Sequence, residues 1–198
     1  AMGDQMTDTL MAERADRLAR IRRLSGFMKW FLTVVMGLVV IIGLFLVVTL
    51  CLPADLLFTA DEMIDIADVE RRMGDIPLGQ RIAIAGLTGL AFFLIAGACW
   101  HIRLVFKRFQ HIEFFDPRTL SSVVSFGRWL IIFAIVDLIS DPVGSALLTL
   151  DLPEGQRSID VTLDGGELFF LILGSLMLVF GWILREAALI AEENKQFI

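Results

Sequence analysis

The sequence is poor in cysteine, proline and charge, and each shortage excludes a class of protein. Two cysteines and five prolines in 198 residues exclude a secreted disulfide scaffold and a collagen-like chain. Charged residues make up only 20% of the chain and stand in blocks between long apolar runs, which excludes a disordered tail. Hydrophobic residues make up 57%, above the roughly 45–50% of soluble domains, and the mean hydropathy is +0.75. This composition indicates a membrane protein.

Four apolar runs are long enough to cross a bilayer. A helix needs about 20 mostly apolar residues to span the roughly 30 Å hydrocarbon core. A backbone in lipid must satisfy its own hydrogen bonds, and barrel strands would alternate rather than run solidly apolar. We therefore predict an all-α membrane protein, a four-transmembrane-helix bundle with a small outer helix and a short outer β-hairpin.

The predicted organisation has nine segments. The first apolar run is about twice the length of the hydrophobic region of a signal peptide and no cleavage site follows it, so we expect it to be retained. In chain order the segments are a cytoplasmic basic amphipathic segment (1–26), transmembrane helix 27–52, an outer loop with a short helix (53–81), transmembrane helix 82–106, a cytoplasmic connector (107–122), transmembrane helix 123–141, an outer loop with a β-hairpin (142–167), transmembrane helix 168–184 and a cytoplasmic helical tail (185–198).

The basic residues predict the orientation. Of the 17 Lys and Arg residues, all but Arg71, Arg72, Arg81 and Arg157 fall in the two terminal segments, the connector and the helix ends beside them. The positive-inside rule then places both termini in the cytoplasm, as in a multi-pass protein of the cell inner membrane. All four tryptophans map to the cytoplasmic halves of their helices, where an interfacial aromatic belt is expected.

The amino-terminal segment combines cations with an apolar stripe. Its five arginines are interleaved with Leu10, Leu18, Ile21 and Leu24 at helical spacing. We expect this segment to lie flat on the cytoplasmic leaflet as a topology signal and lipid anchor, with no direct role in binding nucleic acid.

The first outer loop carries the signature of a short helix. Thr59-Ala60-Asp61-Glu62 forms a capping box, and an apolar stripe follows it. Gly74 and Pro77 would end this helix. The members of the stripe are Met63, Ile66, Ala67 and Met73.

The second outer loop alternates apolar and polar residues over 148–152 and 158–163, and Pro153-Glu154-Gly155-Gln156 between them is a turn sequence. This pattern predicts the β-hairpin, which should pack on the first outer loop or on another copy of the chain. Before the third span, Asp116 and Pro117 predict an N-cap and a first helical residue. Asp141-Pro142 predicts a kink or the end of that span.

Residues able to carry chemistry are few. Asp137 is an ionisable residue inside a span and is therefore a candidate intramembrane polar site, although it lies near enough to the outer end to reach interfacial water. His101 and His111 are interpreted as interfacial polar residues. Cys51 and Cys99 lie at different depths and cannot form a disulfide within one chain. We expect no catalytic residue, metal site or cofactor.

Small residues recur at helical spacing. They allow helices to approach closely, either within one chain or between two chains of a homodimer. They are Ala85, Gly86, Gly89 and Gly97 in the second span, and Gly174 and Gly181 in the fourth.

Two segments resemble a bacterial family of four-span membrane proteins, domain-of-unknown-function family 2975. One is Leu184-Arg185-Glu186-Ala187-Ala188-Leu189 followed by Glu192-Glu193-Asn194 and Phe197-Ile198. The other runs from Phe115-Asp116-Pro117 to Gly127-Arg128. The resemblance implies an integral membrane protein without enzymatic activity, often encoded beside a small helix-turn-helix regulator of the Xre type.

The leading hypothesis is a regulatory or sensory membrane protein, not an enzyme, whose cytoplasmic face binds a soluble partner such as this type of transcription regulator. The alternative is a small transporter or channel subunit that acts as an oligomer, with Asp137 facing its pore. The candidate partner-binding residues are Phe115, Asp116, Arg185, Glu186, Glu192, Glu193 and Asn194.

Overall fold

A computed structural model describes residues 2–52, 63–66, 69–111, 116–157, 159, 161 and 163–195. Four of its helices are long and apolar enough to cross a membrane, which confirms the four predicted spans. Between the first two lie a two-stranded antiparallel hairpin and a short 3-10 turn. The elements are α1 (Met2–Cys51), β1 (Met63–Ile66), β2 (Val69–Arg72), η1 (Met73–Asp75), α3 (Leu78–Phe109), α4 (Pro117–Thr149) and α5 (Gly165–Lys195).

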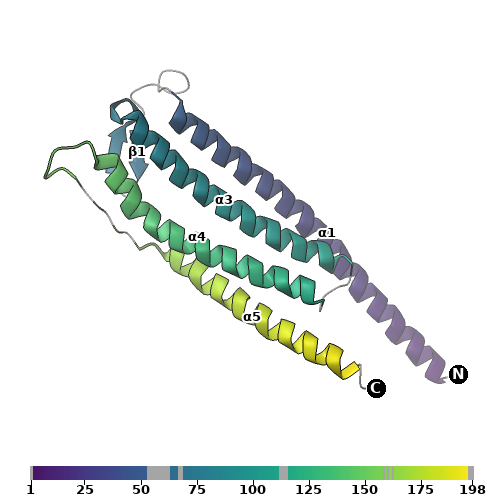
Figure 1. Ribbon diagram of the computed structural model, residues 1–198. Helices are drawn as coiled ribbons and strands as arrows, with labels where there is room; N and C mark the ends of the chain where they lie inside the picture. Colours follow the sequence, from purple (N-terminus) through teal and green to yellow (C-terminus); the bar gives the residue numbers. More distant parts are fainter. Residues whose placement is uncertain are drawn as a thin grey trace.

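The four long helices form an antiparallel row (Figure 1). Among the described residues, extensive helix contacts join α1 to α3, α3 to α4 and α4 to α5, so each helix packs on its neighbour in sequence. α1 and α5 therefore occupy opposite edges of an open row, rather than closing a bundle around a shared core. Both termini lie at one end, called here the termini end, and the β-hairpin lies at the other, called the loop end.

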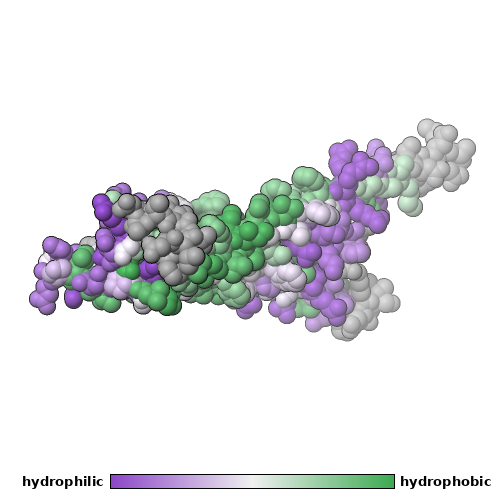
Figure 2. Space-filling model, turned by 90° about the horizontal axis from the view of Figure 1, so that it is seen from above, coloured by the Kyte–Doolittle hydropathy of each residue, from purple (hydrophilic) through white to green (hydrophobic). Residues whose placement is uncertain are grey.

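An apolar belt surrounds the middle of the row. Figure 2 shows hydrophobic residues across the centre of the molecule and hydrophilic residues toward both ends. Large apolar side chains in this belt are exposed, for example Leu38 (53%) on α1 and Ile172 (61%) on α5. A continuous exposed apolar surface of this kind fits contact with lipid rather than with water.

Glycines bring the backbones of α4 and α5 into contact. A Cβ atom at Gly127 would lie 2.6 Å from the carbonyl oxygen of Gly174, and one at Gly174 would lie 2.9 Å from the carbonyl oxygen of Gly127. Lipid tails are as apolar as leucine, so helices in a bilayer associate through this close packing rather than through a hydrophobic driving force. On α3, the ring of Trp129 from α4 covers Gly97 in the same way.

A small hydrophobic cluster holds the loop end together. Ile76, Ile84 and Leu148 are 4%, 2% and 0% exposed, and Leu50 of α1 and Ile64 of β1 pack against them. The cluster joins α1, the hairpin, α3 and α4, so the first loop is anchored on the helix row.

The expected helix in the first outer loop is wrong over residues 63–66 and 69–72, which form the β-hairpin; its capping box lies outside the described residues. Ile64 and Val69 are β-branched residues that favour strands. Ile64 also packs on the loop-end cluster and the hairpin contacts α4, so tertiary packing outweighs the helical spacing.

The expected hairpin in the second outer loop is corrected as well. Leu148 belongs to the last turn of α4, and the described residues from 150 to 163 contain no strand. Burial of Leu148 in the loop-end cluster favours continuation of the helix, which runs past Pro142 instead of ending at Asp141. The turn at Pro153–Gln156 is confirmed, because the Gln156 amide donates to the Pro153 carbonyl at 3.1 Å and Gly155 has φ +100°.

The basic amino-terminal segment continues α1 without a break, so the expectation of a separate helix lying flat on the leaflet is not met. Gly26 lies beside the side chain of Gln110, at the end of α3. Residues 2–25 therefore project past α3 by about 36 Å at 1.5 Å per residue, as Figure 1 shows.

We predict that Gly127→Ala destabilises the protein, because the new methyl group would enter the α4–α5 backbone contact. Overpacking of this kind costs about 1–3 kcal/mol. Gly86→Ala is the matched control, because no atom lies within 4 Å of its Cβ position and alanine is the better helix former. Thermal unfolding in detergent should show a lower midpoint for Gly127→Ala only; equal midpoints would contradict the contact.

Candidate functional site

Polar residues gather at both ends of the row, and Arg71 is the central one at the loop end. Its guanidinium group donates to both carboxylate oxygens of Asp151, from Nη1 to Oδ1 at 2.6 Å and from Nη2 to Oδ2 at 3.1 Å. It also donates to the carbonyl oxygens of Leu148 and Asp75. Arg71 thus joins the first loop to the end of α4 and to the second loop.

The ion pair between Arg71 and Asp151 shifts the pKa of each group in the direction that favours its charged form. The hydrogen bond to Asp151 raises the pKa of Arg71, although partial burial acts against it. The same hydrogen bond holds the pKa of Asp151 below its usual value, and a hydrogen bond with Gln80 adds to this. Both groups therefore stay charged around neutral pH.

Arg81 closes the carboxyl end of α1. Its side chain is buried (6% exposed), and Nη2 donates to the carbonyl oxygens of Thr49 and Leu52. The last carbonyls of a helix lack helical partners and carry partial negative charge, so a cation stabilises them. Three buried atoms at this contact have no hydrogen-bond partner and could each form a further hydrogen bond. They are Arg81 Nε, Thr49 Oγ1 and Gln80 Oε1.

Glu167 performs the corresponding role at the start of α5. It is 4% exposed, and its carboxylate accepts a hydrogen bond from the Asp164 amide at 3.0 Å. The Asp164 carboxylate accepts from the Gly165 amide at 2.6 Å. A carboxylate is favoured at a helix amino terminus. The loop end of α5 is therefore fixed by its own side chains.

Asp137, the predicted intramembrane polar site, is half-buried on α4. The carboxylates of Glu167, Asp141 and Asp164 are close enough to act on it electrostatically. The part of the chain that the structure describes contains no group of acidic, histidine or cysteine residues arranged to hold a metal ion. Asp137 therefore belongs to an acidic neighbourhood beside the loop end.

At the termini end, the predicted partner-binding residues have different environments. Asp116 caps α4 as predicted, accepting from the Arg118 amide at 2.9 Å, while Phe115 lies outside the described residues. The remaining five are exposed along the last turns of α5. They are Arg185, Glu186, Glu192, Glu193 and Asn194.

The structure brings Asp116 to the height of this tail. Gly181 of α5 packs on Val124 of α4, and the two helices run antiparallel. Counting eight residues in opposite directions from that contact places Asp116 level with Leu189. The predicted residues thus share one end of the row, although only the tail leaves its side chains free for a partner.

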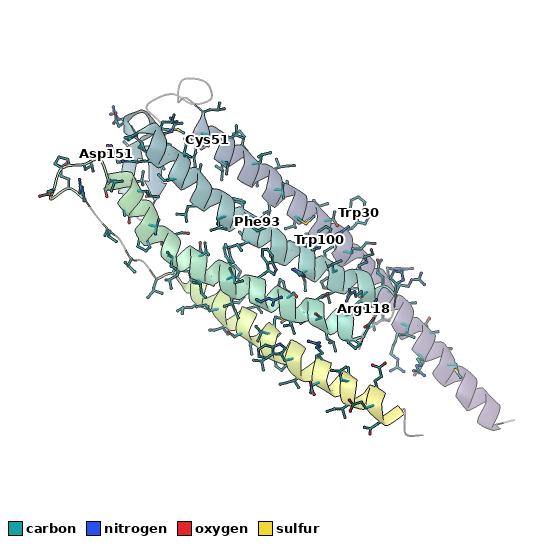
Figure 3. All side chains as sticks on the ribbon, in the orientation of Figure 1. Trp30, Cys51, Phe93, Trp100, Arg118 and Asp151 are labelled. Carbon is teal, nitrogen blue, oxygen red and sulfur yellow. The ribbon has the colours of Figure 1, made fainter. Side chains whose placement is uncertain are left out.

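Polar contacts also connect the spans near the termini end. Arg103 of α3 donates from Nε to Thr33 Oγ1 of α1 at 2.7 Å and lies 5.4 Å from the ring centre of Trp100. The rings of His101 and Trp129 are 5.9 Å apart. In Figure 3, Trp30 and Trp100 lie toward the termini end, whereas Cys51 and Asp151 mark the loop end.

The loop-end contacts were hard to predict from the sequence. Arg71 and Arg81 were visible only as exceptions to the positive-inside pattern, and Asp151 is separated from Arg71 by 80 positions. The one signal in the sequence was the presence of arginines on the acidic side of the chain. A cation in that position needs a hydrogen-bond acceptor nearby.

Comparison with protein-family models, with curated proteins and with solved structures found no match for the chain.

We predict that Asp151→Asn removes part of the acid sensitivity of the fold. The pKa of Asp151 is lowered in the folded state, so its stabilisation is complete above the unfolded value of about 3.9 and is lost as pH falls through the folded value. The pair is partly exposed, so the effect at pH 7 is about 1 kcal/mol or less.

Thermal unfolding at pH 7 and pH 3 checks this. The unsubstituted chain should lose more stability between the two than Asp151→Asn does. Glu154→Gln, at an exposed residue of the same loop, is the control and should behave like the unsubstituted chain. Identical pH dependence in all three would contradict a role for the Arg71–Asp151 pair.

Proposed function

We propose that this chain is a regulatory or sensory protein of the bacterial inner membrane, without catalysis, which binds a soluble cytoplasmic partner at its termini end. The carrying observation is that α1 and α5, the two edge helices, each run unbroken from the loop end to a segment that projects past α3 and α4. A change at the loop end can therefore move a surface at the other end.

The loop end is suited to sensing because a partly exposed ion pair and a capping arginine supplement the hydrophobic cluster that anchors it. Arg71–Asp151 joins the loops, and Arg81 holds the end of α1. A signal that breaks the Arg81 contact would release the end of α1, and one that breaks the Arg71–Asp151 pair would release the first loop from the end of α4. Coupling of this kind needs an element with two arrangements that both sites bias; in this proposal, that element is the position of an edge helix against its single neighbour.

The termini end is suited to binding a partner because its side chains are exposed. The tail of α5 presents Glu186, Glu192 and Glu193, and the projecting part of α1 presents arginines. The concentration of basic residues at this end supports a cytoplasmic location through the positive-inside rule. The resemblance to family 2975 supports a small Xre-type helix-turn-helix regulator as the partner.

We predict that deleting residues 186–198 abolishes binding of the partner without removing the protein from the membrane. Affinity purification from the native membrane, followed by mass spectrometry, should recover a DNA-binding regulator with the full chain and not with the truncated one. A triple substitution of Glu186, Glu192 and Glu193 by Gln tests the same surface without truncation.

Glu154→Gln at the loop end controls for the change in charge and should retain the regulator. An identical set of bound proteins for the full and truncated chains would contradict the proposal.

The alternative, a transporter or channel subunit, draws its support from the acidic group around Asp137. If this alternative holds, Asp137→Asn should lower cation flux into liposomes about tenfold or more, whereas Asp75→Asn, at an exposed loop residue, should leave it unchanged. If the chain is a regulator, liposomes that contain either variant or the unsubstituted chain will show the same cation flux as protein-free liposomes.

A further inference from the structure

We propose that copies of this chain assemble edge to edge in the membrane, with α5 of one copy packed against α1 of the next. The row leaves one side of α1 and one side of α5 without a neighbouring helix, because each edge helix packs extensively on one other helix only. The two edges differ from each other in charge and match each other in height. This inference concerns self-assembly and stands independently of the soluble partner.

Contacts between neighbouring helices allow heights to be compared across the row. Each pair of neighbouring helices has a close contact at a glycine. The two residues in such a contact lie at the same height along the row. The three contacts are Gly26 with Gln110, Gly97 with Trp129, and Gly181 with Val124.

Counting along the antiparallel helices from these contacts relates α1 to α5. Gln110 at the end of α3 stands level with Asp116 at the start of α4, and Asp116 stands level with Leu189 of α5. Gly26 and Leu189 therefore lie at the same height, within about one helical turn. The same heights apply to α1 of one copy and α5 of the next when both copies have the same orientation in the membrane. Each residue closer to the amino terminus on α1 then lies level with a residue closer to the carboxyl terminus on α5.

Opposite charges meet at these heights. At these heights exposed Arg20 and Arg23 flank the free side of α1, and exposed Glu193 flanks the free side of α5, whereas Arg22 lies on the α3 side, beside Gly26 and Gln110. The ion pairs found within the described residues are Arg17 with Glu13 and Arg71 with Asp151, so Arg20, Arg23 and Glu193 have no ion-pair partner among these residues. An acidic edge beside a basic edge favours a neighbour of the same kind and steers its approach.

Exposed apolar side chains also match in height. Both edges repeat them at intervals of seven, seven and four residues, which keeps them on one side of a helix. In level pairs they are Leu24 with Ile190, Phe31 with Ile183, Leu38 with Leu176, and Ile42 with Ile172, all of them exposed.

The orientation also continues the pattern of the row. α1 and α5 point in opposite directions, so α5 beside the α1 of a second copy repeats the antiparallel packing of α1 on α3, α3 on α4 and α4 on α5. The interface uses two different surfaces and is therefore heterologous, which produces a ring or an extended row instead of a two-fold dimer. A two-fold homodimer, one of the two arrangements that the small residues allow, would instead place identical edges together.

Cysteine cross-linking in proteoliposomes tests this arrangement. In a chain with Cys51→Ser and Cys99→Ser, a mixture of Leu24→Cys and Ile190→Cys copies should form disulfide-linked dimers under mild oxidation. Either variant alone should form at least about tenfold fewer, because α1 does not meet α1 and α5 does not meet α5. Mixing Leu24→Cys with Ile172→Cys is the matched control, because these positions differ in height by about 27 Å.

Charge reversal provides a second measurement. Changing Arg20 and Arg23 to Glu in the Leu24→Cys copy should lower the cross-linking yield about threefold or more. Changing Glu193 to Arg in the Ile190→Cys copy should raise the yield again. Arg14→Glu with Arg17→Glu, farther from the tail, should have less effect.

Strong cross-linking of either single variant would overturn the proposal in favour of a two-fold dimer. Equal and low yields in every mixture would overturn it in favour of edges covered by lipid alone. Neither result depends on recovery of a regulator, so failure of this inference is distinguishable from failure of the proposed function.

Discussion

The structure depends on a constraint that lipid imposes: apolar surface gives helices no reason to associate in a bilayer, so close backbone contact and polar bonds must hold them together. The Gly127–Gly174 contact meets this requirement between α4 and α5, and Trp129 lying on Gly97 meets it between α3 and α4. The hydrogen bond from Arg103 to Thr33 does so between α3 and α1. Because each contact joins neighbours in sequence, the result is a row.

The arginines on the acidic side illustrate the same principle at the loop end. Arg71 is held by a carboxylate and two carbonyls, Arg81 by the last carbonyls of α1, and Arg157 donates to the Leu152 carbonyl at 2.9 Å. These cations serve the structure of the loops, which explains why they stand apart from the basic residues at the termini end. The described residues thus combine a locally bonded loop end with exposed charge at the other end.

The features that could be predicted from the sequence are those set by local patterns. Long apolar runs identified the four spans, Asp116-Pro117 identified the start of α4, and Pro153-Glu154-Gly155-Gln156 identified a turn. Features set by tertiary contact could not be predicted in the same way. Helical spacing misassigned residues 63–66 and 69–72 because the packing of Ile64 is absent from the local pattern. Helix α4 runs past Pro142 because Leu148 is buried by elements distant in sequence.

The candidate site was predictable only in part, for a related reason. Exposed tail residues follow from the polar face of a helix that leaves the bilayer, and the structure agrees on Arg185 to Asn194. The Arg71–Asp151 contact joins two loops whose meeting depends on the order of the helices in the row. That order follows from side-chain packing between helices, which the hydropathy pattern does not contain.

Accessibility labelling of single cysteines tests the central claim most directly, namely that the row crosses the inner membrane four times with both ends of the chain in the cytoplasm. In intact spheroplasts of a chain with Cys51→Ser and Cys99→Ser, a membrane-impermeant maleimide should label Glu154→Cys and spare Ala15→Cys and Asn194→Cys until the cells are opened. Labelling of Ala15→Cys and Asn194→Cys on opposite sides, or of Glu154→Cys only after opening, would contradict the account.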